Sequence, residues 1–199
     1  MSANYQANNN CYAYSTNIAS NSFAQPGRLH GLQLNKIEPN WTKEDVKKGA
    51  IKDGLVYVGG EELSPNELWQ HVPDYAPYKG HFVALLISDR KDFHLKMKEE
   101  DHIIEWEWEE WPGDYHWVRC DNYDTDSWSQ KDGGDQVTNF DFAGAPITDP
   151  RSACWTVNQG PMFQYYDKNG NPLGNPDSIV VEYKFYCWMY VPNGKVHII

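Results

Sequence analysis

The apolar positions of the chain follow two different patterns. Residues 81–87 (His-Phe-Val-Ala-Leu-Leu-Ile) form a nearly continuous apolar run that is rich in β-formers, and this predicts a central strand covered on both faces. Residues 104–109 (Ile-Glu-Trp-Glu-Trp-Glu) alternate strictly instead, so glutamates and tryptophans fall on opposite faces of a strand. We expect residues 93–98 and 103–108 to form a hairpin that lays its tryptophans on the body of the protein. The alternative is that these tryptophans form a platform for a ligand.

Helix signals occur in the first third of the chain. Asn10 is a preferred N-cap, because its side-chain oxygen can accept a hydrogen bond from the first helical turn. A helix is predicted from Cys11 to about Ala24. Thr42 and Asp45 have the spacing of a capping box and predict a second helix directly after them.

The rest of the chain has the signals of strands and turns. Further strands are expected at residues 114–119, 127–131, 179–184 and 185–191. Helices near the start and strands after them predict an α+β fold. We find no internal repeat and no break in composition, so one domain is expected over residues 1–199, with the hairpin at about 92–111 as an insertion.

Charge and composition argue against two classes of partner. The chain has 17 Lys and Arg against 28 Asp and Glu, a formal net charge of -11, which repels phosphate backbones and argues against nucleic-acid binding. No apolar run is long enough to cross a bilayer, so no membrane insertion is expected. The first residues have no basic and apolar leader, so we expect no ordinary signal peptide and synthesis in the cytoplasm. Nine Trp, 13 Tyr and seven Phe favour β-structure and concave binding surfaces.

The four cysteines are widely spaced and form no CxxC pair, so a structural zinc site has little support. One disulfide among Cys120, Cys154 and Cys187 is left open by the sequence. Cys11 differs from these three because it directly follows a helix cap, where unpaired backbone N–H groups favour a thiolate. That is the placement a nucleophile needs. The alternative is a small buried helix residue.

Two histidines lie on predicted strands, His81 at the head of one and His116 on the following sheet strand. A cysteine hydrolase needs a thiolate, a histidine that carries the proton, and a third polar group that holds the tautomer of the imidazole. Either histidine could instead be a hydrogen-bonded sheet residue. The remaining histidines are expected on the surface or in loops: His30, His71, His94, His102 and His197.

Several short stretches together resemble known cysteine hydrolases. They are residues 10–14 (Asn-Cys-Tyr-Ala-Tyr), 25–27 (Gln-Pro-Gly), 80–85 (Gly-His-Phe-Val-Ala-Leu), 114–117 (Asp-Tyr-His-Trp), 128–131 (Trp-Ser-Gln-Lys), 137–139 (Val-Thr-Asn) and 147–151 (Ile-Thr-Asp-Pro-Arg). The histidine strand is similar to that of the NlpC-like and CHAP-like papain-fold amidases. The combination resembles a bacterial family of uncharacterised cysteine-peptidase-like proteins.

The resemblance implies a papain-like fold, in which an N-terminal nucleophile helix packs on a central antiparallel β-sheet. It implies hydrolysis of a peptide amide, in particular in peptidoglycan stem peptides, without a metal or another cofactor. Small proteins of this type resemble type VI secretion effectors with antibacterial activity. The implied partners are then a secretion machinery and a cognate immunity protein, and the implied destination is the periplasm of a target cell.

The chain departs from this pattern at residue 130, where Gln130 stands in place of the expected histidine. Glutamine can orient an imidazole but cannot titrate. Two triads are therefore open. The first, which we prefer because it keeps the usual strand order, uses Cys11, His81 as the base and His116 as the orienting group. The second uses Cys11, His116 and Gln130.

In either triad the oxyanion is expected to be held by the Cys11 backbone N–H together with a side-chain amide. The candidates for this amide are Asn10 and Gln25.

Two other classes of function compete with the hydrolase. In the first, the aromatic residues form a carbohydrate- or protein-binding face, and Cys11 is only a buried helix residue. In the second, the chain is a metal-dependent hydrolase that uses His81, His116 and an aspartate such as Asp114.

Overall fold

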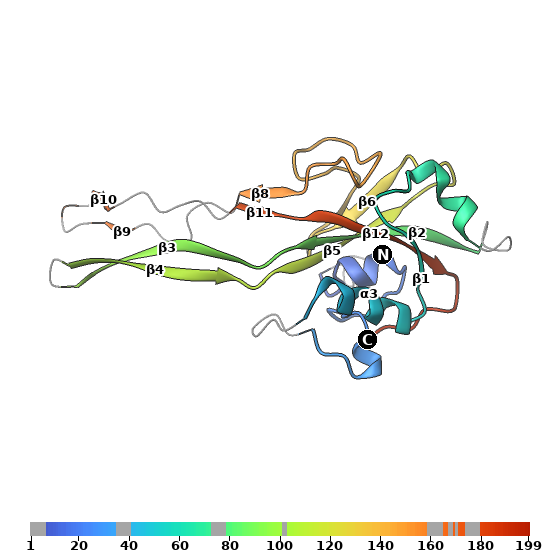
Figure 1. Cartoon of the computed structure of the whole chain (residues 1–199), viewed down its shortest axis with the longest axis horizontal. Coiled ribbons are helices and arrows are strands. Elements are labelled where there is room, and N and C mark those ends of the chain that lie inside the picture. The colour runs from blue at the N-terminus through green and yellow to red at the C-terminus, as the bar shows by residue number, and fades with distance from the viewer. Residues whose placement is uncertain are drawn as a thin grey trace.

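The computed structural model describes residues 7–34, 41–72, 79–100, 103–158, 165–166, 169, 171–173 and 180–199. Its centre is a six-stranded sheet in which every neighbouring pair is antiparallel (Figure 1). In order across the sheet, the strands are β1 (Val56–Gly59), β12 (Lys184–Pro192), β2 (Gly80–Ser88), β5 (Asp114–Cys120), β6 (Trp128–Lys131) and β7 (Val137–Thr138). Mixed helices and an antiparallel sheet confirm the predicted α+β class.

The predicted central strand is confirmed as β2, which lies between β12 and β5. Its residues from Phe82 to Ser88 are all buried. One face packs on a cluster that includes Cys11, Tyr12 and Val46, and the other on a cluster rich in tryptophan. Burying a Val, Leu, Ile or Phe side chain typically contributes about 1.5–3 kcal/mol, so this strand holds both layers of the protein to the sheet.

The second predicted helix is confirmed as α3 (Lys43–Lys52). The Thr42 side chain accepts from the Asp45 backbone N–H, and the Asp45 side chain accepts from the Thr42 backbone N–H. These two bonds form the predicted capping box. The helix ends before Gly54, whose φ of 108° requires a residue without a Cβ.

The first helix is much shorter than predicted. α2 comprises only Cys11–Ser15, because Asn17 takes a left-handed conformation with φ 60°. The backbone N–H groups of Asn17 and Ile18 return to the carbonyls of Tyr14 and Ala13, which is the Schellman pattern that ends a helix. The predicted end at Ala24 is wrong, since asparagine can occupy the left-handed position without a glycine or proline.

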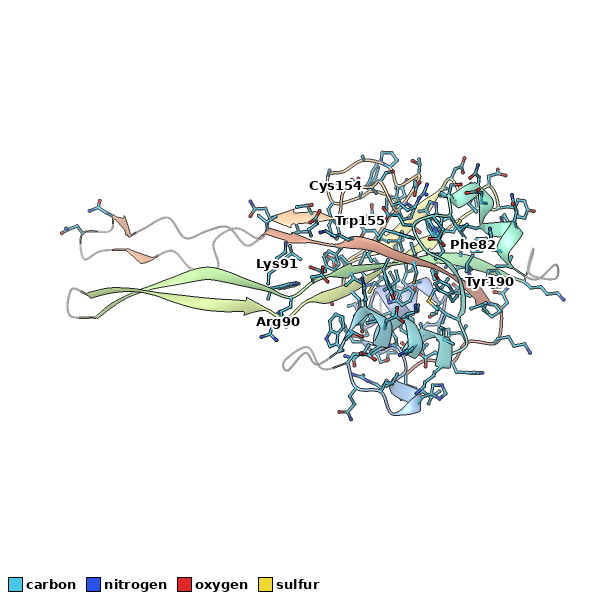
Figure 2. All side chains as sticks on the ribbon, in the orientation of Figure 1. Phe82, Arg90, Lys91, Cys154, Trp155 and Tyr190 are labelled. Atoms are coloured by element: carbon cyan, nitrogen blue, oxygen red, sulfur yellow. The ribbon has the colours of Figure 1, made fainter. Side chains whose placement is uncertain are left out.

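The predicted hairpin is confirmed as β3 (Lys91–Glu100) paired with β4 (Ile103–Trp111). It prolongs β2 and β5 and runs away from the end of the sheet (Figure 1). Figure 2 shows Arg90 and Lys91 where this ribbon leaves the body, whereas Phe82 lies inside the body. The ribbon therefore does not lie on the body as we expected. The positions of the tryptophan side chains at 106 and 108 lie outside what the structure describes.

The remaining elements are short. Residues 28–30 and 65–71 form the 3-10 helices η1 (Arg28–His30) and η2 (Pro65–His71). Two further pairs are β8 (Thr156–Asn158) with β11 (Val180–Glu182) and β9 (Tyr165–Tyr166) with β10 (Pro172–Leu173). The strands predicted at 179–184 and 185–191 correspond to β11 and β12. Within the described ranges, no helix has the length and apolarity needed to cross a membrane.

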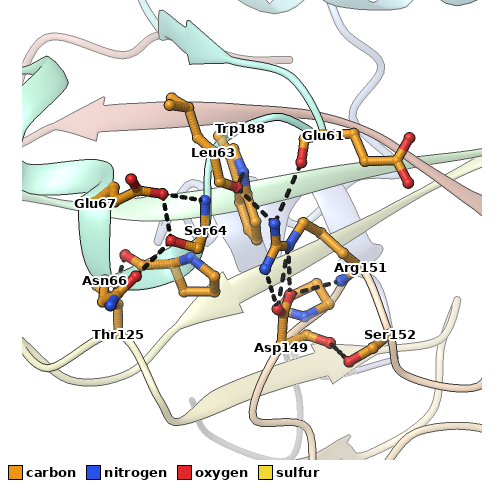
Figure 3. Close-up of polar contacts among 12 residues, drawn as sticks. Glu61, Leu63, Ser64, Asn66, Glu67, Thr125, Asp149, Arg151, Ser152 and Trp188 are labelled. Carbon is orange, nitrogen blue, oxygen red and sulfur yellow. Dashed lines mark hydrogen bonds and ion pairs between the residues drawn. The ribbon is translucent and has the colours of Figure 1, made fainter.

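The stretch around Asp149 and Arg151 is structural. The Arg151 guanidinium binds the Asp149 carboxylate at 2.6 Å and donates to the carbonyls of Glu61 and Leu63 (Figure 3). The Trp188 indole N–H donates to the same Leu63 carbonyl. This network ties the loop before η2 to β12 and to the segment after β7.

Candidate functional site

A pocket of about 250 Å³ lies where α2 begins, beside the start of β5. Four residues predicted for the site line it: Asn10, Cys11, Gln25 and His116. Asp114, Tyr115, Asp132 and Gly133 form other parts of its wall. The structure thus brings together, in one pocket, residues that lie more than a hundred positions apart in the chain.

Local capping positions the cysteine. The Asn10 side-chain oxygen accepts from the backbone N–H of Ala13 at 3.1 Å, so Asn10 is the N-cap that the sequence predicts. Its amide nitrogen donates to the carbonyl of Ala24 at 2.7 Å, which holds the segment that carries Gln25 against the helix start. Cys11 is the first helical residue, and its side chain is almost fully buried, with 7% of the residue exposed.

His116 is held by a side-chain amide on the neighbouring strand. Its Nε2 lies 2.7 Å from Gln130 Oε1, and Gln130 Nε2 donates to the carbonyl of Phe140 at 2.8 Å. A carbonyl can only accept, so the amide presents its oxygen to the ring and Nε2 carries the hydrogen. In this tautomer Nδ1 is the unprotonated ring nitrogen.

The sheet geometry explains how a cysteine on a helix and this histidine reach the same pocket. Along β5, Tyr115 and Trp117 belong to the layer of α2, whereas the intervening His116 contacts the rings of Trp155 and Tyr183 in the other layer. β6 pairs with β5 only from Val118 to Cys120. The pocket lies beside the preceding part of β5, so groups from both layers can approach it around the edge of the sheet.

His81 lies elsewhere. Its Nε2 is 2.6 Å from the carbonyl of Ser15 at the end of α2, and it lines a different pocket of about 410 Å³ together with Arg119. Since Leu86 is the residue of β2 opposite His116, His81 lies roughly 16 Å further along the strand at about 3.3 Å per residue. Burial lowers the pKa of His81 to about 4, so its ring is neutral at neutral pH.

The structure therefore brings together the second predicted triad, Cys11, His116 and Gln130. It does not bring together the first triad, which uses His81 as the base and which we had preferred. The physical reason is register: the order of the strands along the chain says nothing about which residues lie opposite each other. The predicted alternative of a metal-dependent hydrolase needs His81 and His116 close together, but these two histidines line separate pockets. The described residues hold no group of three or more side chains arranged to bind a metal ion.

The other cysteines differ clearly from Cys11. All four cysteines lie in described parts of the chain and are free thiols, so the disulfide left open by the sequence does not form. Burial raises the pKa values of Cys120 and Cys187 to about 12, which makes both thiols unreactive near neutral pH. Cys154 is partly exposed.

Lys131 lies next to the pocket and was not among the predicted site residues. It ends β6, is fully buried and donates from Nζ to the carbonyl of Gly133 at 2.7 Å. No local signal marks it, because its neighbours in the sequence, Gln130 and Asp132, are both polar. We had assigned it only to a hairpin strand.

Fold and site together define an α+β protein that carries a cysteine, a histidine and a glutamine at the edge of an antiparallel sheet. No protein-family model matches the chain, and no solved structure matches it. The chain is 31% identical over 161 residues to insoluble matrix shell protein 1 of Ruditapes philippinarum, a match that covers 80% of this chain and 77% of that protein. The chain belongs to the same family as this shell protein.

Proposed function

We propose that the chain is a cysteine hydrolase that cleaves an amide bond, with Cys11 as nucleophile and His116 as general acid and base. The observation that carries this proposal is the shared pocket of Cys11, His116 and Gln25, together with the fixed bond from His116 Nε2 to Gln130. A nucleophile, a base and a group that orients the base are the parts that covalent amide hydrolysis needs. A short helix that carries the cysteine and packs on an antiparallel sheet supports a papain-like arrangement.

The mechanism follows from the tautomer of His116. With the hydrogen on Nε2, the Nδ1 atom takes the proton of the Cys11 thiol. The thiolate attacks the carbonyl carbon, and Nδ1 then gives the proton to the leaving amine, which leaves a thioester on Cys11. Water, deprotonated by Nδ1, attacks this thioester and releases the acid and the free thiol.

Gln25 is the better candidate for the amide that holds the oxyanion. Its side chain lines the pocket and makes no hydrogen bond to the residues that the structure describes. Asn10 already uses its oxygen on Ala13 and one amide hydrogen on Ala24. One oxyanion donor typically contributes about 3–4 kcal/mol to the stabilisation of the transition state.

The pocket wall favours substrates with a positive group near the scissile bond, because Asp114 and Asp132 both line it. Peptidoglycan stem peptides, which the sequence resemblance implies, contain amides next to amino groups and are the first substrates to test. Delivery as an antibacterial effector, with a secretion machinery and an immunity protein as partners, stays a prediction.

The experiment compares Cys11→Ala with Cys154→Ala, a matched change at a partly exposed cysteine outside the pocket. Each purified protein is incubated with peptidoglycan and with a panel of peptide amides, and new amino groups are quantified by mass spectrometry. We expect Cys11→Ala to lose at least about a thousandfold in rate and Cys154→Ala to keep the activity of the unchanged protein. Full activity in a folded Cys11→Ala protein would sink the proposal.

A second candidate function comes from the family. The relative is named as an insoluble matrix shell protein, and the second candidate for this chain is therefore a component of an insoluble matrix, in line with the predicted alternative of a binding module. Sedimentation separates the two functions. A matrix component enters an insoluble fraction equally well with Cys11 or Ala at this position, whereas the hydrolase loses its activity.

A further inference from the structure

Lys131 occupies the layer of the protein that contains Cys11. Ser129, two residues earlier on β6, lies 2.6 Å from the hydroxyl of Tyr14 on α2. Side chains two residues apart on a strand point to the same face, so Lys131 also faces the α2 layer. Its side chain has no exposed surface.

The ammonium of Lys131 is stabilised in this buried position by one hydrogen bond and by the negative charges of Asp135 and Asp132. It donates to the carbonyl of Gly133, a residue of the pocket wall, and forms no ion pair with a carboxylate among the described residues. Burying an ammonium without a charged partner is costly. A buried cation that donates to a residue of the wall of a pocket containing a thiol has a natural counter-charge there, namely the thiolate.

We propose that the Lys131 ammonium stabilises the thiolate of Cys11 and so keeps the nucleophile ionised independently of His116. This inference rests on the proposed function and assigns Lys131 as a positioning residue that acts through charge. The nucleophile thereby has two sources of positive charge, the fixed ammonium of Lys131 and the transient imidazolium of His116.

The titration behaviour of the neighbouring groups agrees with this assignment. Burial lowers the pKa of Lys131, while Asp135, Cys11 and Asp132 raise it. Electrostatic coupling between two titrating groups is reciprocal. Because the Cys11 thiolate stabilises the Lys131 ammonium, the ammonium also stabilises the thiolate. The acidic groups that act against the thiolate or share the Lys131 charge with it are Asp114 and Asp132 in the pocket wall and Asp135.

Two phenols also interact electrostatically with the cysteine. Burial raises the pKa values of Tyr115 and Tyr183 above the ordinary range, and Cys11 contributes to both increases. Both phenols therefore stay neutral and do not compete with Lys131 as charge partners of the thiolate.

The test measures the rate of iodoacetamide alkylation of Cys11 against pH by peptide mass spectrometry in Lys131→Met and Lys131→Gln. Methionine keeps the length of the side chain, and glutamine keeps a donor for Gly133. We expect the midpoint of the profile to rise by about one pH unit, which makes alkylation about tenfold slower below the midpoint. Lys131→Arg, which keeps the charge, is expected to restore the profile in part.

An unchanged midpoint in a folded Lys131→Met or Lys131→Gln protein overturns the inference. If neither variant folds, His116→Gln decides. With Lys131 intact, Cys11 should still alkylate with a midpoint below the ordinary value of about 8.5, and a midpoint at or above that value overturns the inference. Alkylation needs no substrate, so this result is separate from the loss of hydrolysis that tests Cys11 as a catalytic residue.

Discussion

The two ends of α2 each face a histidine from the sheet, and the two histidines are held in different ways. At the start of the helix, His116 lines a pocket together with Cys11, and its Nε2–H donates to the side-chain oxygen of Gln130. At the end of the helix, the Nε2–H of His81 donates to the backbone carbonyl of Ser15. The first arrangement places an imidazole and a thiol in the wall of one pocket, whereas the second ties a strand to a helix. The two histidines also differ in burial, since His116 is buried and His81 is only partly buried, and in what the rest of each pocket contains.

Replacing each histidine in turn tests this difference most strongly. We expect His116→Ala to lower the rate of amide hydrolysis about 10²- to 10⁴-fold, which is the contribution that general acid–base catalysis typically makes. We expect His81→Gln, which keeps a donor for Ser15, to stay within about threefold of the unchanged protein. Steady-state kinetics on one peptide amide measures both. Equal losses in two folded variants would mean that the two ends of α2 do not differ in function.

The sequence could not predict which of the two histidines shares a pocket with Cys11, because this depends on the register between β2 and β5. Local signals predicted β2 and the capping box of Thr42 and Asp45, because such signals depend on residues within one turn or one strand. The position of His116 opposite Leu86 depends on pairing between strands separated by the β3–β4 ribbon. No local pattern encodes that pairing.

The same reasoning explains what was and was not predicted at the pocket. The cap at Asn10 fixed the start of α2, so the placement of Cys11 could be predicted. The end of the helix at Asn17 could have been predicted too, because asparagine is the residue other than glycine that most often takes a left-handed conformation. The burial of Lys131 could not, since it depends on a helix and a loop that pack over the end of β6.

A smaller effect is expected from the group that orients His116. Gln130→Ala removes the acceptor for Nε2–H, so the ring can rotate or change tautomer. Loss of a partner that fixes a working imidazole typically costs about 10- to 100-fold, and we expect a fall of this size in kcat. Gln130→Glu keeps an acceptor and should recover part of the rate. Its carboxylate should also move the acidic limb of the pH–rate profile to higher pH, because a negative charge favours the imidazolium.

The shift of the pH–rate profile distinguishes a Gln130 that orients His116 from a Gln130 that only stabilises the fold. If Gln130→Ala and Gln130→Glu lose stability but keep the kcat and the pH profile of the unchanged protein, then Gln130 holds only the loop at Phe140. Chemical denaturation of the same samples provides the comparison.

The smallest effect concerns the histidine at the other end of α2. Its pKa is lowered to about 4 chiefly by burial, with a further lowering by Arg119 and an opposing increase from the hydrogen bond to Ser15. Below pH 6.5 the unfolded chain binds a proton at His81 that the folded protein does not bind. The contribution of His81 to the free energy of unfolding is therefore fully present above pH 6.5 and is lost as the pH falls toward 4. At pH 5 the loss should be about 2 kcal/mol, since one pKa unit corresponds to about 1.4 kcal/mol.

His81→Gln has no such proton to bind, so its free energy of unfolding should fall less between pH 7 and pH 5 than that of the unchanged protein. Urea denaturation at the two pH values measures the difference, and other titrating groups cancel because both proteins share them. Parallel pH dependence in the two proteins would contradict the prediction and would mean that the imidazole titrates normally at the end of α2. His81 would then be open to solvent and free to act on a ligand, and the contrast between the two ends of the helix would have to be given up.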